Sequence, residues 1–415
     1  MIWLLCGYMW LFIHRPFEVW PWMADLRIER VYMLATIAYW ALFAEKSWTS
    51  NRLNSAFALL ALSIMASAVL GAYSSGNPLD NLAVEGWLKV AVFYVLVMSS
   101  VREERDLKIL VTMFLVSMGL YMAHSYREFL CGRYGYAMGV SRMVGVDRTF
   151  NNPNSFAATV VYGIPMVYPA WLLARNRWHH LLLVGYVGLS LLCILLTGSR
   201  SAFAGVVLLV ALVALGSRYR LRWALLACIA VPVVWANLRG DLQNRYLTLI
   251  DPSYGPANAQ ASAEGRTQNF FEGIELWKRY PVTGVGPGCA SKATASGSKL
   301  FNFYGQVLAE LGTLGALAML MVAGGLVANA IEMLRLTRHS GPEAAFPRRV
   351  AIAVVVTLLL MLVLGWGGNN LYRYTWLWFG AFQAVALHCL LKRSEKAVDE
   401  APLVTIADTV ESTCL

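Results

Sequence analysis

The chain has 415 residues, of which 58% are hydrophobic and only 14% are charged. Soluble domains carry about 25% charged residues, so this composition excludes a soluble globular protein. The net charge of +10 suits a protein among anionic lipids and needs no nucleic acid to explain it. The apolar runs are continuous rather than alternating, which excludes a transmembrane β-barrel. We therefore predict an all-α polytopic membrane protein.

Twelve apolar segments are long enough, or nearly so, to cross a membrane as helices. The first has no basic region before it and no small-residue cleavage site after it, so we interpret it as a retained span rather than a signal peptide. The tenth is long for one span, and we expect it to be tilted, extended, or kinked at Gly312 or at Gly324-Gly325. The predicted spans are 2–13, 29–45, 55–72, 84–100, 107–124, 155–174, 181–197, 201–216, 222–237, 303–334, 350–366 and 374–391.

The loops fall into two sets that differ in basic residues. Lys and Arg are far denser in the short loops of one set, which by the positive-inside rule faces the cytoplasm together with both termini. The opposite, outer face then carries two long loops, 125–154 and 238–302. We therefore expect a transmembrane domain over 1–393 and a disordered cytoplasmic tail over 394–415.

The second outer loop is long enough to form a small lid with helices of its own. The segment 264–280 has helical spacing, and Pro281 ends it. Arg266, near the start of this helix, is expected to point at a site beneath it. The apolar stripe that should face the bundle consists of Phe270, Phe271, Ile274 and Trp277.

The seven cysteines are scattered, and they include no Cys-x-x-Cys pair. No cluster of histidines accompanies them, so we expect no metal site and no other cofactor. Cys131 and Cys289 both fall in predicted outer loops, and the sequence leaves open whether they form a disulfide.

The segment Thr197-Gly198-Ser199-Arg200-Ser201 joins two spans at the outer face. Gly198 permits a tight turn, and Ser199 or Ser201 can cap the next helix. The free amides of that helix end, the hydroxyls and the guanidinium of Arg200 together would make an oxyanion site. An arginine that merely snorkels from a helix end fits the local pattern equally well.

Arg266 is followed by the glycine-rich run 284–288, in which glycine would let the backbone approach a phosphate closely. An ordinary surface turn is the simpler interpretation if the glycines alone are considered.

Gln306 and Glu310 are four apart on one helical face, and a carboxylate inside a span is a functional candidate or a structural hydrogen-bonding group. Arg373 follows a short outer loop, where it either anchors the interface or lines the same anion site.

In their order along the chain, these sequence motifs resemble those of the O-antigen ligase and polymerase superfamily. The resemblance covers about residues 140–380. The segment 197–201 is the most specific piece, and Asn-Pro-Asn at 152–154, Arg266 and the Leu-Ala-Glu-Leu-Gly run at 308–312 add to it. The resemblance implies a multi-pass enzyme of the bacterial inner membrane. Such an enzyme moves a saccharide from a polyprenyl diphosphate onto an acceptor hydroxyl at the periplasmic face, without a metal.

The resemblance also implies residue roles. Arg200 and Arg266 would hold the diphosphate, and inversion at the anomeric carbon calls for a base. Ligases commonly carry His-Asn before the tenth span, where this chain has Phe301-Asn302. Substitute bases are Glu310, Glu264 and Glu272, unless the proton leaves late and needs no strong base. The expected substrate-binding residues are Ser199, Ser201, Asn152, Asn154, Asn302, Gln306 and Arg373; at the two asparagines 152 and 154, plain helix capping is the simpler alternative.

Ligase-like transfer is slightly favoured over polymerisation of an O-antigen or exopolysaccharide. A lipid-linked saccharide transporter is less favoured, because the unusual residues cluster at the outer rim rather than at the bilayer midplane. A non-catalytic scaffold is a further alternative, since the family histidine is missing. The expected partners are a polyprenyl-diphosphate-linked saccharide, a glycan, lipid or protein acceptor, and membrane lipids, but no nucleic acid.

Overall fold

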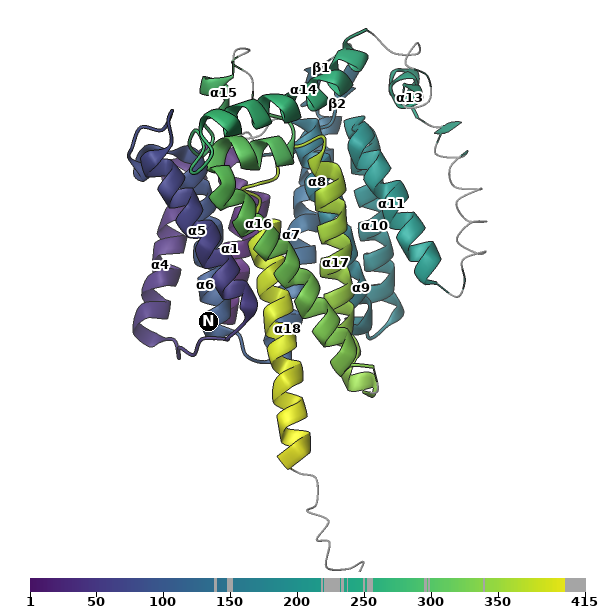
Figure 1. The fold of residues 1–415 in the computed structure, drawn as a ribbon. Helices are drawn as coiled ribbons and strands as arrows, with labels where there is room; N and C mark the ends of the chain where they lie inside the picture. The colour runs from purple at the N-terminus through teal and green to yellow at the C-terminus, as the bar shows by residue number, and fades with distance from the viewer. Residues whose placement is uncertain are drawn as a thin grey trace, which may run out of the picture.

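Long apolar helices stand side by side as one bundle (Figure 1). In the part of the chain that the structure describes, eight helices are long and apolar enough to cross a membrane. The chain is therefore an all-α polytopic membrane protein, as predicted. The computed structural model describes residues 1–137, 140–147, 152–217, 219, 232, 235, 236, 238–248, 251, 257–294, 297, 299–338 and 340–399.

The element bounds follow the predicted spans closely. The long helices are α1 (Ile2–His14), α4 (Ile28–Phe43), α5 (Arg52–Leu70), α6 (Leu82–Ser100), α7 (Glu104–Leu130), α8 (Pro153–Gly163), α10 (Arg177–Thr197), α11 (Arg200–Gly216), α14 (Ala257–Arg279), α16 (Phe303–Leu336), α17 (Ala345–Gly365) and α18 (Tyr374–Asp399). The short elements are α2 (Pro16–Val19), α3 (Pro21–Asp25), η1 (Pro78–Asp80), η2 (Ile164–Met166), α9 (Val167–Ala170), η3 (Trp171–Leu173), α13 (Gly240–Leu247), α15 (Ala290–Ala293), η5 (Pro342–Ala344), and strands β1 (Gly135–Ala137) and β2 (Val140–Arg142).

Some predicted segments differ from the structure or fall outside the described residues. The predicted span 222–237 falls almost wholly outside the described residues, so the number of spans stays a prediction. Helix α18 runs to Asp399, past the predicted start of the tail at 394. Just before residue 394, Arg393 forms an ion pair of 2.7 Å with Glu104, at the start of α7. Residues 400–415 lie outside the described residues.

Aromatic side chains fill the core between α1, α6, α16 and α18. The ring of Trp378 lies 4.2 Å from that of Phe93 on α6 and 5.1 Å from that of Phe12 on α1. Trp376 stacks on Phe303, the first residue of α16, at 5.5 Å. This packing fixes where α16 begins relative to α18, and the candidate site lies next to that beginning.

Helix α16 is broken at Gly312, one of the two predicted kink positions, where φ is 64° and ψ is −157°. This conformation lies in the region that favours glycine. The backbone groups that the break releases pair with the segment before α15. Thr313 N donates to Pro281 O at 2.8 Å, and Val285 N donates to Ala309 O at 2.8 Å. The break thus anchors the loop that follows α14.

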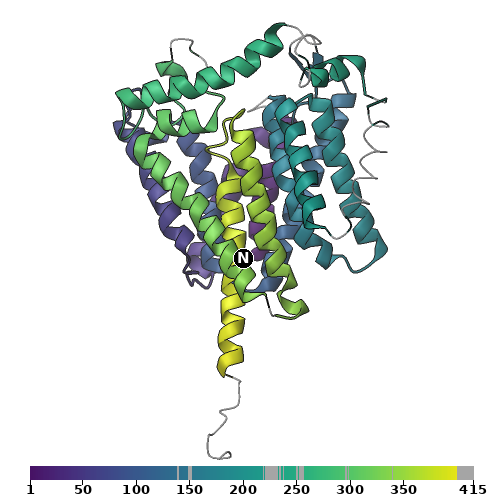
Figure 2. The ribbon, with the colours of Figure 1, turned by 45° about the vertical axis from the view of Figure 1, so that its right-hand side comes forward.

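Helix α14 lies across one end of the bundle as a lid (Figure 2). The helix predicted over 264–280 is confirmed, although it begins earlier, at Ala257. It crosses α16 where two glycines meet, since a Cβ on Gly273 would lie 2.5 Å from Cα of Gly305. We call this end of the bundle the lid end; it also carries β1, β2, α13 and α15 (Figure 1).

The predicted apolar stripe of α14 needs correction. Phe271 is 59% exposed, whereas Leu276 is buried. The reason is the glycine crossing, which turns Gly273 toward α16 and its neighbour Phe271 away. Phe270 does face the bundle, with its ring 5.4 Å from that of Trp366.

Cys131 and Cys289 are both free thiols, so the structure does not form the disulfide that the sequence left open. Cys131 is exposed just after α7, whereas Cys289 is buried. The Cys289 thiol donates instead to Pro287 O at 3.6 Å.

Candidate functional site

The turn between α10 and α11 brings Arg200 to the lid end. Gly198 ends α10 with a φ of 58°, in the left-handed region. Ser199 then caps α11, because its Oγ accepts from Ala202 N at 3.4 Å, which confirms one of the two predicted caps. The Arg200 Nη1 atom donates to Thr248 Oγ1 at 3.0 Å. The turn thus sets where the Arg200 side chain starts, and Thr248, just after α13, holds its guanidinium.

Two further arginines brace the same turn. The Nε atom of Arg142, at the end of β2, donates to Thr197 O at 2.6 Å. The Nε atom of Arg245, on α13, donates to Gly198 O at 2.7 Å. Both side chains are buried. They satisfy carbonyl groups that the end of α10 would otherwise leave unpaired, and they place positive charge at the negative end of its dipole.

Arg142, Arg200, Arg245 and Arg266 form what we call the arginine cluster. Burial, and then the charges of Arg245, Arg200 and Arg266, lower the pKa of Arg142 to about 9. Burial, and then the charge of Arg200, also lower the pKa of Arg266. Within the described ranges, no carboxylate forms an ion pair with Arg142 or Arg266. Partly desolvated like charges of this kind favour the binding of an anion.

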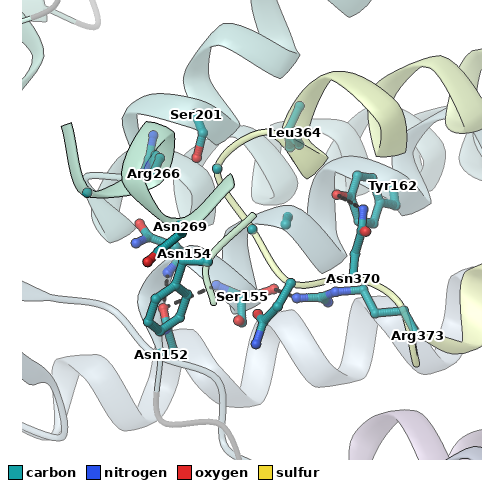
Figure 3. Close-up of a pocket in the computed structure, with 16 residues that line it drawn as sticks. Asn152, Asn154, Ser155, Tyr162, Ser201, Arg266, Asn269, Leu364, Asn370 and Arg373 are labelled. Atoms are coloured by element: carbon teal, nitrogen blue, oxygen red, sulfur yellow. Dashed lines mark hydrogen bonds between the residues drawn. The ribbon is translucent and has the colours of Figure 1, made fainter. Parts of the chain in front are cut away.

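A pocket of about 290 Å³, shown in Figure 3, is lined by residues of the lid helix α14 and by residues near the turn that carries Arg200. Arg266 belongs to its wall, and so does Ser201, the neighbour of Arg200. Among the described residues, no histidine, aspartate or glutamate lines it. Amide and hydroxyl side chains make up most of its polar wall, namely Asn152, Asn154, Ser155, Tyr162, Ser201, Asn269, Asn369 and Asn370.

The structure brings together only part of the predicted site. The predicted residues that line the pocket are Asn152, Asn154, Ser201, Arg266 and Arg373. Those that do not line it are Ser199, Arg200, Asn302, Gln306 and Glu310, together with the substitute bases Glu264 and Glu272. Phe301, at the position where the resemblance implied a histidine, does line it.

Arg142 connects the pocket to the turn at the end of α10. Asn152 caps α8, with its Oδ1 accepting from Asn154 N at 2.9 Å. The Oδ1 atom of Asn154 in turn accepts from Arg142 Nη2 at 2.7 Å. The same guanidinium therefore contacts the pocket wall and the turn that carries Arg200. The sequence reasoning missed this arginine and Arg245, because each lies far from its partners along the chain.

Asn302 positions the lid rather than lining the pocket. Its Oδ1 caps α16 by accepting from Gly305 N at 3.0 Å, and its side chain is fully buried. Its Nδ2 donates to Trp366 O at 3.1 Å and to Arg266 O at 3.5 Å. Directly beyond, the Arg266 guanidinium packs against Gly367, where a Cβ would lie 2.9 Å from Arg266 Cζ. These contacts give Asn302 a positioning role, and the predicted substrate contact stays a prediction.

Glu310 is likewise buried outside the pocket. Its Oε2 accepts from Gly288 N at 2.8 Å and from Tyr372 OH at 2.6 Å, and its Oε1 accepts from Gln306 Nε2 at 3.4 Å. Through its contacts with Gly288 and Tyr372, this carboxylate connects the loop after α14 to the loop before α18. This geometry does not favour the general-base role expected for Glu310, nor the substrate contact expected for Gln306.

Residues 185–320 match the family model described as O-antigen ligase. The matched segment contains the turn with Arg200, the lid helix α14 with Arg266, and the first part of α16. Over this segment, the match confirms the predicted resemblance to the O-antigen ligase and polymerase superfamily. Arg142, Asn152, Asn154 and Arg373 lie outside the matched segment. No curated protein matches the chain.

Proposed function

We propose that this multi-pass membrane protein is a glycosyltransferase that moves a saccharide from a polyprenyl diphosphate to an acceptor hydroxyl. The observation that carries the proposal is the arginine cluster beside an amide-lined pocket. Guanidinium groups match phosphate oxygens in pairs, with both charge and geometry. Amides and hydroxyls both donate and accept, as sugar hydroxyls require. The two parts of the site thus fit the two parts of a lipid-linked saccharide.

We place the reaction at the periplasmic face of the bacterial inner membrane. The lid end carries the long loops, whereas the opposite end carries the short loops that are dense in Lys and Arg. By the positive-inside rule, the lid end then faces away from the cytoplasm, and both termini lie in the cytoplasm. A lipid-linked donor would present its diphosphate at this membrane surface.

The proposed step is a direct displacement with inversion. The acceptor oxygen forms a bond to the anomeric carbon while the bond from that carbon to the diphosphate oxygen breaks. The polyprenyl diphosphate leaves with the electron pair, and the acceptor hydroxyl loses its proton. Arg266 and Arg200 stabilise the negative charge that develops on the leaving group. Because the arginine side chains supply the positive charge, the proposed transfer needs no metal ion.

The pocket wall suggests how the proton is lost. Phe301 cannot accept a proton, and the described part of the wall contains neither imidazole nor carboxylate. An oxocarbenium-like transition state makes the acceptor hydroxyl acidic only late in the reaction. We therefore propose late proton loss to solvent rather than transfer to a strong base.

Ligase-like transfer is the first candidate activity, and polymerisation of an O-antigen or exopolysaccharide repeat is the second. Phe301 on the pocket wall favours the second, because the resemblance links the histidine at this position to ligases. A transporter is less favoured, since transporter sites lie near the bilayer midplane and this pocket lies at the lid end. A non-catalytic scaffold would bind the donor without transferring it.

A reconstituted reaction separates these candidates. The full chain in nanodiscs is incubated with a radiolabelled polyprenyl-diphosphate oligosaccharide, with and without lipid A-core. Label on lipid A-core identifies a ligase, and longer lipid-linked chains identify a polymerase. A folded protein that binds the donor and yields neither product contradicts the proposed transfer.

A further inference from the structure

We propose that Arg373 and Asn370 form a subsite for an acidic sugar, such as a hexuronic acid, within the saccharide that this protein handles. The inference rests on the proposed glycosyl transfer and deepens it by naming a substrate class. It starts from a second positive charge in the pocket, one that the diphosphate does not explain. Figure 3 shows Arg373 reaching into the pocket from the side opposite Arg266.

Neutral groups hold the Arg373 guanidinium in place. Its Nη1 donates to Thr159 Oγ1, and its Nη2 donates to Ser155 O at 3.2 Å. Its guanidinium lies over the Tyr162 ring, 5.9 Å from the centroid. These contacts fix the direction of the side chain and leave its charge in place, because none of the three partners carries a negative charge.

The charge of Arg373 is not balanced by an acid in the described chain. None of the ion pairs between described residues includes it. It also stands apart from the arginine cluster. The charges that lower the pKa values of Arg142, Arg245 and Arg266 come from within the cluster, and Arg373 contributes to none of these shifts. One pocket therefore offers two separate cationic positions.

Asn370 adds a hydrogen-bond acceptor to the pocket that Arg373 also lines. Its Nδ2 donates to Met361 O at 2.9 Å and to Tyr162 OH at 3.3 Å, which fixes the orientation of the amide. Its side chain is 2% exposed and lines the pocket, and its Oδ1 has no hydrogen-bond partner among the described residues. Unsatisfied buried acceptors are rare in folded proteins and call for a ligand or another partner.

A guanidinium and an unpaired acceptor in one pocket match the chemistry of a sugar acid. The carboxylate pairs with Arg373, and a neighbouring hydroxyl of the same sugar donates to Asn370 Oδ1. A neutral sugar would displace water from the guanidinium without supplying an opposite charge, and that desolvation is unfavourable. The subsite therefore selects for an acidic sugar over a neutral one of the same size.

Binding of two matched monosaccharides tests this proposal. Saturation-transfer NMR is recorded on the full chain in nanodiscs with methyl glucuronide and with methyl glucoside, which differ only in the carboxylate. We expect the wild type to prefer the glucuronide, and Arg373→Gln to weaken that binding by about 10- to 100-fold while leaving the glucoside unchanged. Thr159→Val, which removes the acceptor of Nη1, should weaken glucuronide binding in the same direction if Arg373→Gln fails to fold.

Inorganic pyrophosphate, followed by ³¹P NMR, separates this proposal from the proposed function. Arg266→Gln should weaken pyrophosphate binding and Arg373→Gln should not. Equal binding of the two glycosides, no binding of the glucuronide, or an unchanged glucuronide affinity in Arg373→Gln would each overturn the acidic subsite. A loss of pyrophosphate binding in Arg373→Gln would also overturn it, by assigning this arginine to the diphosphate. Absence of pyrophosphate binding in the wild type would instead count against the proposed function.

Discussion

The Nη2 atom of Arg142 donates a 2.7 Å hydrogen bond to Oδ1 of Asn154, while its Nε donates to the carbonyl of Thr197. One buried side chain thereby sets the distance between the pocket wall and the turn that carries Arg200. Lysine keeps the charge but cannot make both contacts. We expect Arg142→Lys to lower the transfer rate by roughly 10- to 100-fold, because small displacements of positioned groups have effects of this size.

A double-mutant cycle with Asn154→Ala checks this role. If the hydrogen bond carries the effect, the double variant should lose little more activity than Arg142→Lys alone. Additive losses would show that the two residues act independently, and they would contradict the bridging role of Arg142.

Glu310 offers a second prediction, because its positioning role and a general-base role give different results. Replacing a general base lowers the rate by about 10²- to 10⁴-fold. Glu310→Gln keeps the size of the side chain and can keep the contact to Tyr372, so we expect a loss of less than about tenfold. The measurement is the transfer rate of Glu310→Gln beside that of Tyr372→Phe, with thermal unfolding of both. A loss of a hundredfold or more in Glu310→Gln alone would restore Glu310 as the base.

Phe301 is the third test, because it occupies the pocket wall where a base could act. In Phe301→His, the neutral imidazole can take the proton from the hydroxyl of the acceptor substrate. We expect the transfer rate to rise by about tenfold or more. Neutral imidazole forms as the pH rises through about 6.5, so the gain should appear above that pH and vanish below it. The pH profile of the transfer rate, with Phe301→Leu as the matched control, measures this. Equal rates in both variants at every pH would mean that the proton leaves by another route.

The broken helix α16 gives a prediction about stability. Gly312 has a φ of 64°, and a Cβ there would lie 2.4 Å from Val282 O. Gly312→Ala should therefore destabilise the protein by about 1–3 kcal/mol and loosen the loop that follows the lid. Gly324→Ala is the matched control on the same helix, because a Cβ there meets nothing within 4 Å. Thermal unfolding in detergent compares the two; equal midpoints would contradict the strain assigned to Gly312.

The sequence predicted the all-α membrane fold, because apolar length is a local property that needs no knowledge of packing, while the number of spans stays a prediction. It also predicted the lid helix, and it gave Gly312 and Ser199 each as one of two candidate positions for the break and the cap, since each feature depends on neighbouring residues. It could not place Glu310, whose partners Gly288 and Tyr372 lie on other segments. The apolar stripe on α14 was partly wrong at Phe271, because a glycine contact with α16 decided which face is buried.

The arginine cluster shows the same limit. Arg200 and Arg266 stand in recognisable motifs, whereas Arg142 and Arg245 have no local signature. Their importance follows from contacts with Thr197 and with Gly198, carbonyls at the end of a distant helix. Pattern and resemblance therefore lead to the chemistry that we propose for the site, and tertiary contacts identify the residues that hold its parts in place.

In the mechanism that we propose, Arg200 and Arg266 together hold a diphosphate at the lid end. The most direct measurement is the transfer rate of Arg200→Ala and Arg266→Ala in nanodiscs with a polyprenyl-diphosphate oligosaccharide. Arg279→Ala, at an exposed position on the same helix as Arg266, is the matched control. We predict a loss of about 10²- to 10³-fold in each of the first two variants, with wild-type rates in the control. Wild-type transfer in both Arg200→Ala and Arg266→Ala would show that neither guanidinium stabilises the diphosphate.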